Sequence, residues 1–223
     1  MSVEAVGSRT AQRIPAPEFA ITGCGHLPFA AGPTLIFSGA ATDATGSEIQ
    51  SIALSVQVMI DPARRGYDSE TRERLAELFG PPATWTPSTQ GLAWARVSAL
   101  VPGFTATASF ELELPCTYDL EVAAAKYFYA LADGFAPLSF HFNGTVFYRD
   151  VDARLQVTPV AWSATAQYSL PIATWRAMIA EHYPGGGWIR VSDATLAALN
   201  ARRGRRGLPS FDMCIEELLS DVG

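Results

Sequence analysis

The chain has 223 residues, of which 48% are hydrophobic and 17% charged, and its formal net charge is −6. A chain of this length buries about 70% of its unfolded surface and needs neither disulfides nor metal to hold a core. The apolar content excludes a disordered protein, and the acidic balance argues against nucleic-acid binding over the whole surface. Because no apolar run approaches the ~20 residues of a membrane span, and the polar first residues carry no export signal, we expect a cytoplasmic protein without membrane contact.

Alternating apolar residues predict antiparallel strands in residues 17–168. Within residues 49–60, apolar side chains at every second position form one face, and serines and Gln57 occupy the other. The alternation is cleanest in residues 104–114, where phenylalanines and leucines alternate with threonines and glutamates. This pattern is typical of an antiparallel strand with one solvent-exposed face. Residues 1–16 show no periodicity and are expected to form a flexible tail.

Two segments inside this region change to the helical period. Residues 69–79 are predicted to form a helix that ends before Gly80-Pro81-Pro82. Residues 116–134 carry an aromatic stripe at helical spacing with little charge, so this helix should pack on the sheet. Strand alternation resumes at residue 137, and Gly144 marks a bulge or a close approach of two backbones.

Residues 169–223 differ from the rest of the chain. We expect in this order a short helix, a glycine hinge, a short strand at 188–192, a helix from about Ser192, and a final helix. The class is therefore α+β, an antiparallel β-sheet packed with helices and followed by a C-terminal strand-helix-helix module. Three parts are expected: the tail 1–16, a sheet domain 17–168 with inserted helices, and a mainly helical module 169–223.

The sequence contains no recognisable catalytic motif. No serine stands in a G-x-S-x-G setting, and Gly185-Gly186-Gly187 lacks the Lys and Ser/Thr of a phosphate loop. Cys24 and His26 could form half of a metal site, but no pair has the short, repeated spacing of structural zinc ligands. We therefore expect a non-enzymatic protein without cofactor or metal, and an enzyme or metal protein that uses Cys24 and His26 is an alternative.

Arginines cluster at the end of the helix expected from Ser192: Arg202, Arg203, Arg205 and Arg206. They either complement the negative pole of that helix in solvent or form a phosphate-binding patch. The order of strand, helix, glycine turn and helix resembles ribbon-helix-helix proteins, in which a ribbon from a dimer enters the major groove. This resemblance implies that Trp188 and Arg190 point outward and join the four arginines as candidate interaction residues. A tryptophan at the ribbon and the large acidic domain before it favour dimerisation or docking over DNA reading.

The chain also carries several distinctive stretches: PFAAGPTLIFSG, SIALSVQVMID, VPGF, PCTYDLEVAAAKYFYALADG, GTVFY and RRGLPSFD. Together they resemble a family of high-GC Gram-positive bacteria that has no assigned activity, over nearly the whole chain after residue 16. The resemblance implies an accessory or assembly role, since genes of that family often lie among nickel-iron hydrogenase clusters, and it transfers no catalytic residue. Residues 116–148 resemble the helix-strand end of the export chaperone SecB, which implies an oligomer that holds unfolded clients in apolar grooves.

These observations predict a cytoplasmic protein that binds another protein. The partner would be a hydrogenase subunit or precursor, or an unfolded client, and the chain itself is expected to form a homo-oligomer. The alternative is a dimeric DNA-binding protein that uses the C-terminal module.

Overall fold

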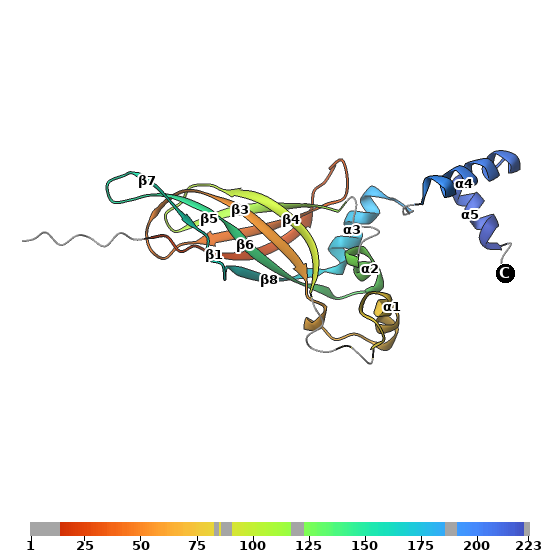
Figure 1. Cartoon of the computed structure of the whole chain (residues 1–223), viewed down its shortest axis with the longest axis horizontal. Coiled ribbons are helices and arrows are strands. Elements are labelled where there is room, and N and C mark those ends of the chain that lie inside the picture. The colour runs from red at the N-terminus through yellow and green to blue at the C-terminus, as the bar shows by residue number, and fades with distance from the viewer. Residues whose placement is uncertain (1–13, 83–84, 86–90, 117–122, 186–190, 221–223) are drawn as a thin grey trace, which may run out of the picture. The chain divides into compact units, whose positions relative to one another are not determined.

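The computed structural model describes residues 14–82, 85, 91–116, 123–185 and 191–220. They form two compact units, residues 1–186 and residues 187–223, which are considered separately. The first unit contains the strands (Figure 1): β1 Glu18–His26, β2 Thr34–Thr42, β3 Glu48–Ile60, β4 Leu92–Val101, β5 Thr107–Pro115, β6 Phe135–Arg149, β7 Leu155–Pro159 and β8 Thr165–Pro171. It also contains four helical segments: the 3-10 helix η1 Pro62–Arg64 and the α-helices α1 Ser69–Phe79, α2 Ala123–Ala130 and α3 Ile172–His182.

The strands form two antiparallel sheets. One sheet has the order β1-β2-β5, and the other has the order β4-β3-β6-β7. The long strand β6 pairs with β8 along residues 135–141 and with β7 along residues 145–149. This arrangement confirms the predicted α+β class with antiparallel pairing.

The core lies between the two sheets and is built from the inward side chains of the alternating segments. Phe19 of β1 stacks on Phe142 of β6 with ring centroids 4.6 Å apart. Phe37 of β2 meets Phe140 of β6 edge to face at 5.1 Å. Each such pair adds about 0.5–1.5 kcal/mol beyond the burial of its area. Aromatic rings from both sheets therefore hold the two layers together.

Two glycines allow close packing between neighbouring strands of the same sheet. Gly39 of β2 lies opposite Phe110 of β5, and a Cβ on Gly39 would stand 2.6 Å and 2.8 Å from two carbons of the Phe110 ring. Gly144 of β6 lies opposite β3, where a Cβ would overlap the carbonyl oxygen of Ala53. The predicted close backbone approach at Gly144 is confirmed.

Helices α2 and α3 cover the end of the strands at which β6 begins and β8 ends (Figure 1). Phe128 of α2 stacks on Trp175 of α3 with centroids 5.2 Å apart. The aromatic helix predicted over residues 116–134 is thus present and packed, with α2 covering part of that range and residues 117–122 outside the described ranges. After α2, Gly134 adopts a φ of 77° and turns the chain into β6.

Helix α1 has the bounds predicted for it. Its N-cap residue Asp68 accepts hydrogen bonds from the backbone N–H and the hydroxyl of Thr71, at 2.7 Å and 2.8 Å. These bonds hold the pKa of the Asp68 carboxyl below its ordinary value. The preceding residue, Tyr67, shares a 2.8 Å hydrogen bond with the hydroxyl of Tyr127 on α2, which fixes the start of α1 against α2.

The first unit extends past the boundary expected at residue 169. Strand β8 pairs with β6, and α3 follows it directly and buries Trp175, so this segment belongs to the sheet unit. The strand expected at 188–192 lies, apart from its last two residues, outside the described residues. Among the helices that the structure describes, none is both long and apolar enough to cross a membrane.

Candidate functional site

The second unit is a hairpin of two helices, α4 Asp193–Arg206 and α5 Phe211–Ser220. Ser192 caps α4 by accepting a hydrogen bond from the backbone N–H of Thr195 at 3.2 Å. Gly207 ends the helix in the left-handed conformation, with φ 64°, and the N–H of Leu208 bonds back to the carbonyl of Arg203 at 3.0 Å. The helix start, the glycine turn and the final helix predicted here are all present.

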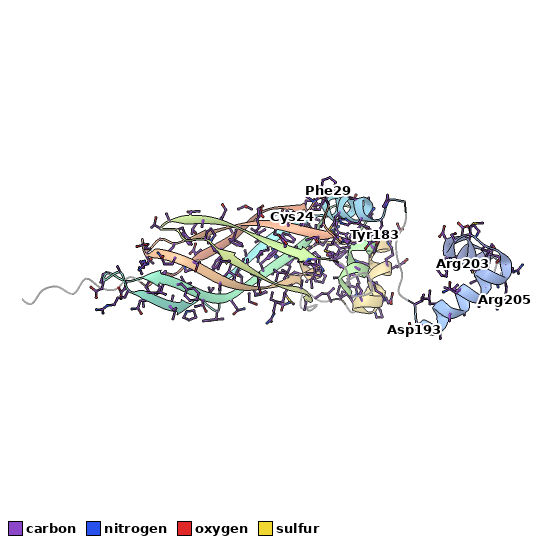
Figure 2. The ribbon with its side chains drawn as sticks, turned by 90° about the horizontal axis from the view of Figure 1, so that it is seen from above. Cys24, Phe29, Tyr183, Asp193, Arg203 and Arg205 are labelled. Carbon is purple, nitrogen blue, oxygen red and sulfur yellow. The ribbon has the colours of Figure 1, made fainter. Side chains whose placement is uncertain are left out.

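Three of the four clustered arginines contact α5. Arg202 and Arg206 both reach the carboxylate of Glu217, at 3.3 Å and 3.5 Å. The guanidinium of Arg203 lies over the ring of Phe211, 4.5 Å from its centroid. Arg205 is exposed, and Figure 2 labels it with Arg203. The cluster therefore holds the hairpin together as well as facing solvent.

The other two candidate residues of this module, Trp188 and Arg190, lie outside the described residues. Nothing in the structure therefore places them beside the arginine cluster. The prediction that they project from a DNA-binding ribbon stays a prediction.

The Cys24 and His26 pair has a partner that the sequence did not indicate. The Nε2 atom of His26 lies 2.6 Å from a carboxylate oxygen of Glu181 on α3. Burial raises the pKa of the Cys24 thiol to about 12, which makes it a poor nucleophile and a poor metal ligand. Within the described ranges, no three side chains of the metal-binding types come together. The His26–Glu181 contact instead ties the end of β1 to α3.

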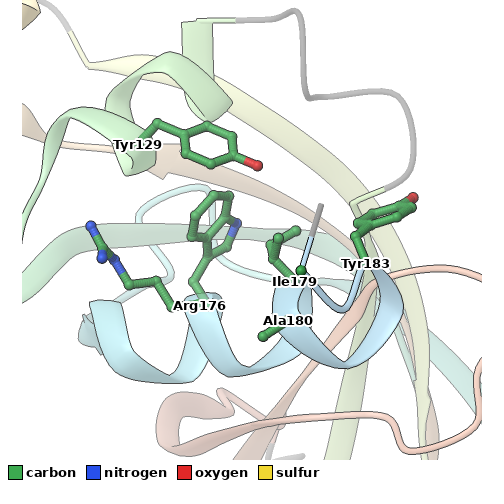
Figure 3. Close-up of a pocket in the computed structure, with 7 residues that line it drawn as sticks. Tyr129, Arg176, Ile179, Ala180 and Tyr183 are labelled. Carbon is green, nitrogen blue, oxygen red and sulfur yellow. The ribbon is translucent and has the colours of Figure 1, made fainter. Parts of the chain in front are cut away.

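A pocket of about 350 Å³ lies beside α3 (Figure 3). Its lining includes Ala180, the residue before Glu181. The ring of Tyr129 from α2 meets that of Trp175 edge to face, with centroids 4.9 Å apart, and Figure 3 shows Tyr183 at the other side of the pocket from Arg176. Its wall consists of three aromatic rings, two aliphatic side chains, one guanidinium and a glycine: Tyr129, Trp175, Tyr183, Ile179, Ala180, Arg176 and Gly185. Arg176 is fixed by a 2.8 Å hydrogen bond from its Nη2 to the carbonyl oxygen of Leu131.

Two features describe the chemical character of this pocket. Tyr129 is half exposed, and burial together with the nearby Tyr183 raises the pKa of its hydroxyl, so the ring is neutral at physiological pH. Arg176 supplies positive charge at one side of a mainly apolar wall. Such a wall suits an apolar or aromatic group that carries a negative charge.

An exposed aromatic residue stands at the same end of the strands. Phe29, three residues after His26, is 98% exposed and has a φ of 59°, which is uncommon for a residue with a bulky side chain. Figure 2 shows Phe29 and Tyr183 toward the end of the first unit that carries α3. Sequence patterns did not single out Phe29, although it lies in the stretch PFAAGPTLIFSG.

The opposite end of the strands carries another exposed apolar surface. Leu155 and Val157 of the edge strand β7 are 61% and 62% exposed. They lie opposite Arg149 and Phe147 of β6 on the outer face of the five-stranded sheet. They line neither the pocket beside α3 nor a second pocket formed by residues 16–19, 161 and 163–165, so they provide a reference surface for tests of the first pocket.

Comparison with known proteins gives a family and no characterised relative. Residues 14–223 match a family of unknown function, DUF6084. No curated protein matches the sequence. Among solved structures, IrmA from Escherichia coli is 9% identical with a TM-score of 0.35, over 66% of this chain and 86% of that one. ApaA from Bordetella pertussis is 12% identical with a TM-score of 0.25, over 70% and 93% of the two chains.

Proposed function

Since the chain belongs to DUF6084, a family of unknown function, we propose that it is a non-enzymatic cytoplasmic protein that binds another protein through the pocket end of its sheet unit. The observation that carries this proposal is the aromatic pocket beside α3, which stands at the same end of the strands as the exposed Phe29. Binding energy in protein interfaces concentrates in aromatic and arginine side chains that meet pockets. This end of the unit offers both kinds of residue.

The partner that fits best presents an apolar or aromatic side chain next to a carboxylate. The side chain would enter between Tyr129 and Tyr183, and the carboxylate would face Arg176. Phe29 would add a second anchor outside the pocket. The resemblance of the chain to a family linked with nickel-iron hydrogenase genes makes a hydrogenase subunit or its precursor the first partner to test. A SecB-like role, in which unfolded clients are held, is the other form of the same proposal.

The test uses the full chain, tagged in its native host and purified under mild conditions. We compare the wild type with the double substitution Tyr129→Ser and Tyr183→Ser, and with Leu155→Ser as the matched apolar control on β7. Hydrogenase subunits or maturation factors should be enriched by the wild type and the control and lost with the double variant. Direct titration of the purified partner should then show at least about a tenfold weaker affinity for the double variant.

Two results would overturn the proposal. One is the same set of enriched proteins with the pocket variant as with the wild type. The other is a preparation that neither enriches a hydrogenase component nor suppresses aggregation of an unfolded client. A normal thermal transition of the pocket variant is required in each case, so that loss of binding is not loss of fold.

DNA binding by the hairpin is the second candidate, because Arg205 and Arg206 are exposed at the end of α4. Affinity for duplex DNA should then fall steeply with salt. Arg205→Ala is the clean variant, since Arg203 contacts Phe211 and its loss would also disturb the hairpin. If the affinity for duplex DNA does not change with salt concentration, or if no binding is detected, this candidate is excluded.

A further inference from the structure

The hairpin of α4 and α5 buries too few side chains to form a hydrophobic core by itself. Within the described residues 191–220, Cys214 is the only buried residue, and α4 buries none. Units below about 40 residues usually need disulfides, metals or oligomerisation to fold stably. Cys214 is a free thiol, and no metal-binding cluster exists among the described side chains. Something else must therefore cover the hairpin.

Several of the large apolar side chains of the hairpin lie on one side of it. On α4, Leu196, Leu199 and Arg203 are spaced three and four residues apart and share a face. On α5, Phe211, Ile215 and Leu218 share a face in the same way, and the contact of Arg203 with Phe211 joins the two faces.

Leu219 flanks that face of α5 and is 71% exposed. Glu217, which binds two arginines of α4, lies farther round the helix, so Leu219 is turned away from the ion pairs. The joined face is therefore one open apolar layer.

The charges of the two helices are of opposite sign. Helix α4 carries four arginines and one aspartate, whereas α5 carries three acidic residues and no basic one. A second copy of the hairpin, related by a two-fold axis, can place its acidic α5 against the basic α4 of the first copy. The same contact is then made twice, as in any two-fold interface. An unrelated partner would have to match this charge pattern by its own sequence, whereas a second copy matches it automatically.

We propose that the chain forms a homodimer in which two α4–α5 hairpins close into a four-helix bundle, with the open layers of Leu196, Ile215 and Leu219 facing each other. Two helices from each copy are the smallest set that surrounds one apolar core in this architecture. The proposal is independent of the partner-binding pocket, because all the residues it uses lie in residues 187–223 and the pocket lies in residues 1–186.

The test measures the mass of the purified full chain by light scattering across a dilution series. The wild type should be a dimer. The double substitution Leu196→Ser and Leu219→Ser should raise the dimer dissociation constant at least about a hundredfold. Both side chains are well exposed in the single hairpin, so their loss costs the fold of the monomer little.

Met213→Ser is the matched control. Met213 lies on α5 but two residues before Ile215, which places it about 200° round the helix from the open layer. It should leave the dimer unchanged. Copies with two different tags, expressed together, should purify as a mixed pair in the wild type and in the Met213 variant only.

A wild type that is monomeric at every concentration overturns the proposal. The apolar layer of the hairpin would then be covered by another protein or by residues 1–186 of the same chain. A dimer that persists unchanged in the Leu196 and Leu219 double variant also overturns it, since the contact must then lie elsewhere.

Discussion

Gly39→Ala should destabilise the sheet unit because the ring of Phe110 occupies the space of the added methyl group. The two residues face each other across β2 and β5, and the new Cβ would lie 2.6 Å and 2.8 Å from two ring carbons. Phe110 cannot move freely, since its ring meets those of Phe19 and Phe142 edge to face, each at 6.2 Å between centroids. The methyl group must therefore displace a ring that belongs to the core.

The size of the effect follows from two opposing contributions. Overpacking a core by one methyl group costs about 1–3 kcal/mol. Alanine loses less backbone entropy than glycine in a strand, which returns about 0.5–1 kcal/mol. We expect a net loss of about 1–2 kcal/mol in the free energy of unfolding, or roughly 3–8 °C in the midpoint of thermal unfolding for a unit of this size.

A double-mutant cycle with Phe110→Leu tests the cause as well as the size. If the ring is what the methyl group strikes, the Gly39→Ala substitution should cost at least about 1 kcal/mol less when Phe110 is already leucine. Gly25→Ala on β1 is the control, because a Cβ there meets nothing within 4 Å, and its unfolding midpoint should stay the same or rise slightly. Strictly additive effects in the cycle would refute the packing argument.

Three further outcomes are expected. Gly144→Ala should cost at least about 2 kcal/mol in urea unfolding, because its Cβ would overlap the rigid backbone of Ala53 rather than a side chain. Tyr67→Phe should cost about 1–3 kcal/mol, because it removes hydrogen bonds to the hydroxyl of Tyr127 and to the carbonyl of Pro62, and the cost should become smaller without disappearing when Tyr127 is also phenylalanine, since the bond to Pro62 is lost in either background. With its pKa raised to about 12, Cys24 should hold roughly a thousandfold less thiolate at pH 8 than an ordinary cysteine and should react with a disulfide reagent only as pH rises or after unfolding.

The strands could be predicted because each has one buried face. In β3 every second residue from Ile52 to Ile60 is buried, which is the period read from the sequence. The strand expected over 104–114 starts at Thr107, because Phe104 forms a separate bridge to Ile49. Alternation fixes which face is buried, but it carries no information about which strand lies beside which.

The pairing of strands and the sites could not be predicted because they depend on contacts between distant segments. Strand β6 serves two partners, β8 and β7, along its length, and nothing in its own sequence divides it. His26 and Glu181 meet only because β1 ends beside α3. The pocket residues Tyr129, on α2, and Tyr183, directly after α3, are separated along the chain by three strands and have no shared motif.

The arginine cluster shows why charge runs alone are a poor guide to function. From the sequence, four arginines in five residues indicate either a solvated helix end or a phosphate site. Neither alternative takes account of Glu217 and Phe211 on α5, which the turn at Gly207 brings into contact with the arginines of α4. Once these contacts are counted, three of the four arginines are engaged with α5, and what remains is an apolar layer between a basic and an acidic helix.

The two surfaces can be separated by what their variants change. Substitutions in the pocket should alter which protein is bound and leave the mass of the chain's own assembly the same. Substitutions at Leu196 and Leu219 should alter that mass. They should weaken partner binding only by the gain in avidity that a dimer obtains from having two linked pockets. A pocket variant that also dissociates the dimer would mean that both units build one interface, and the separation argued from their contacts would then fail.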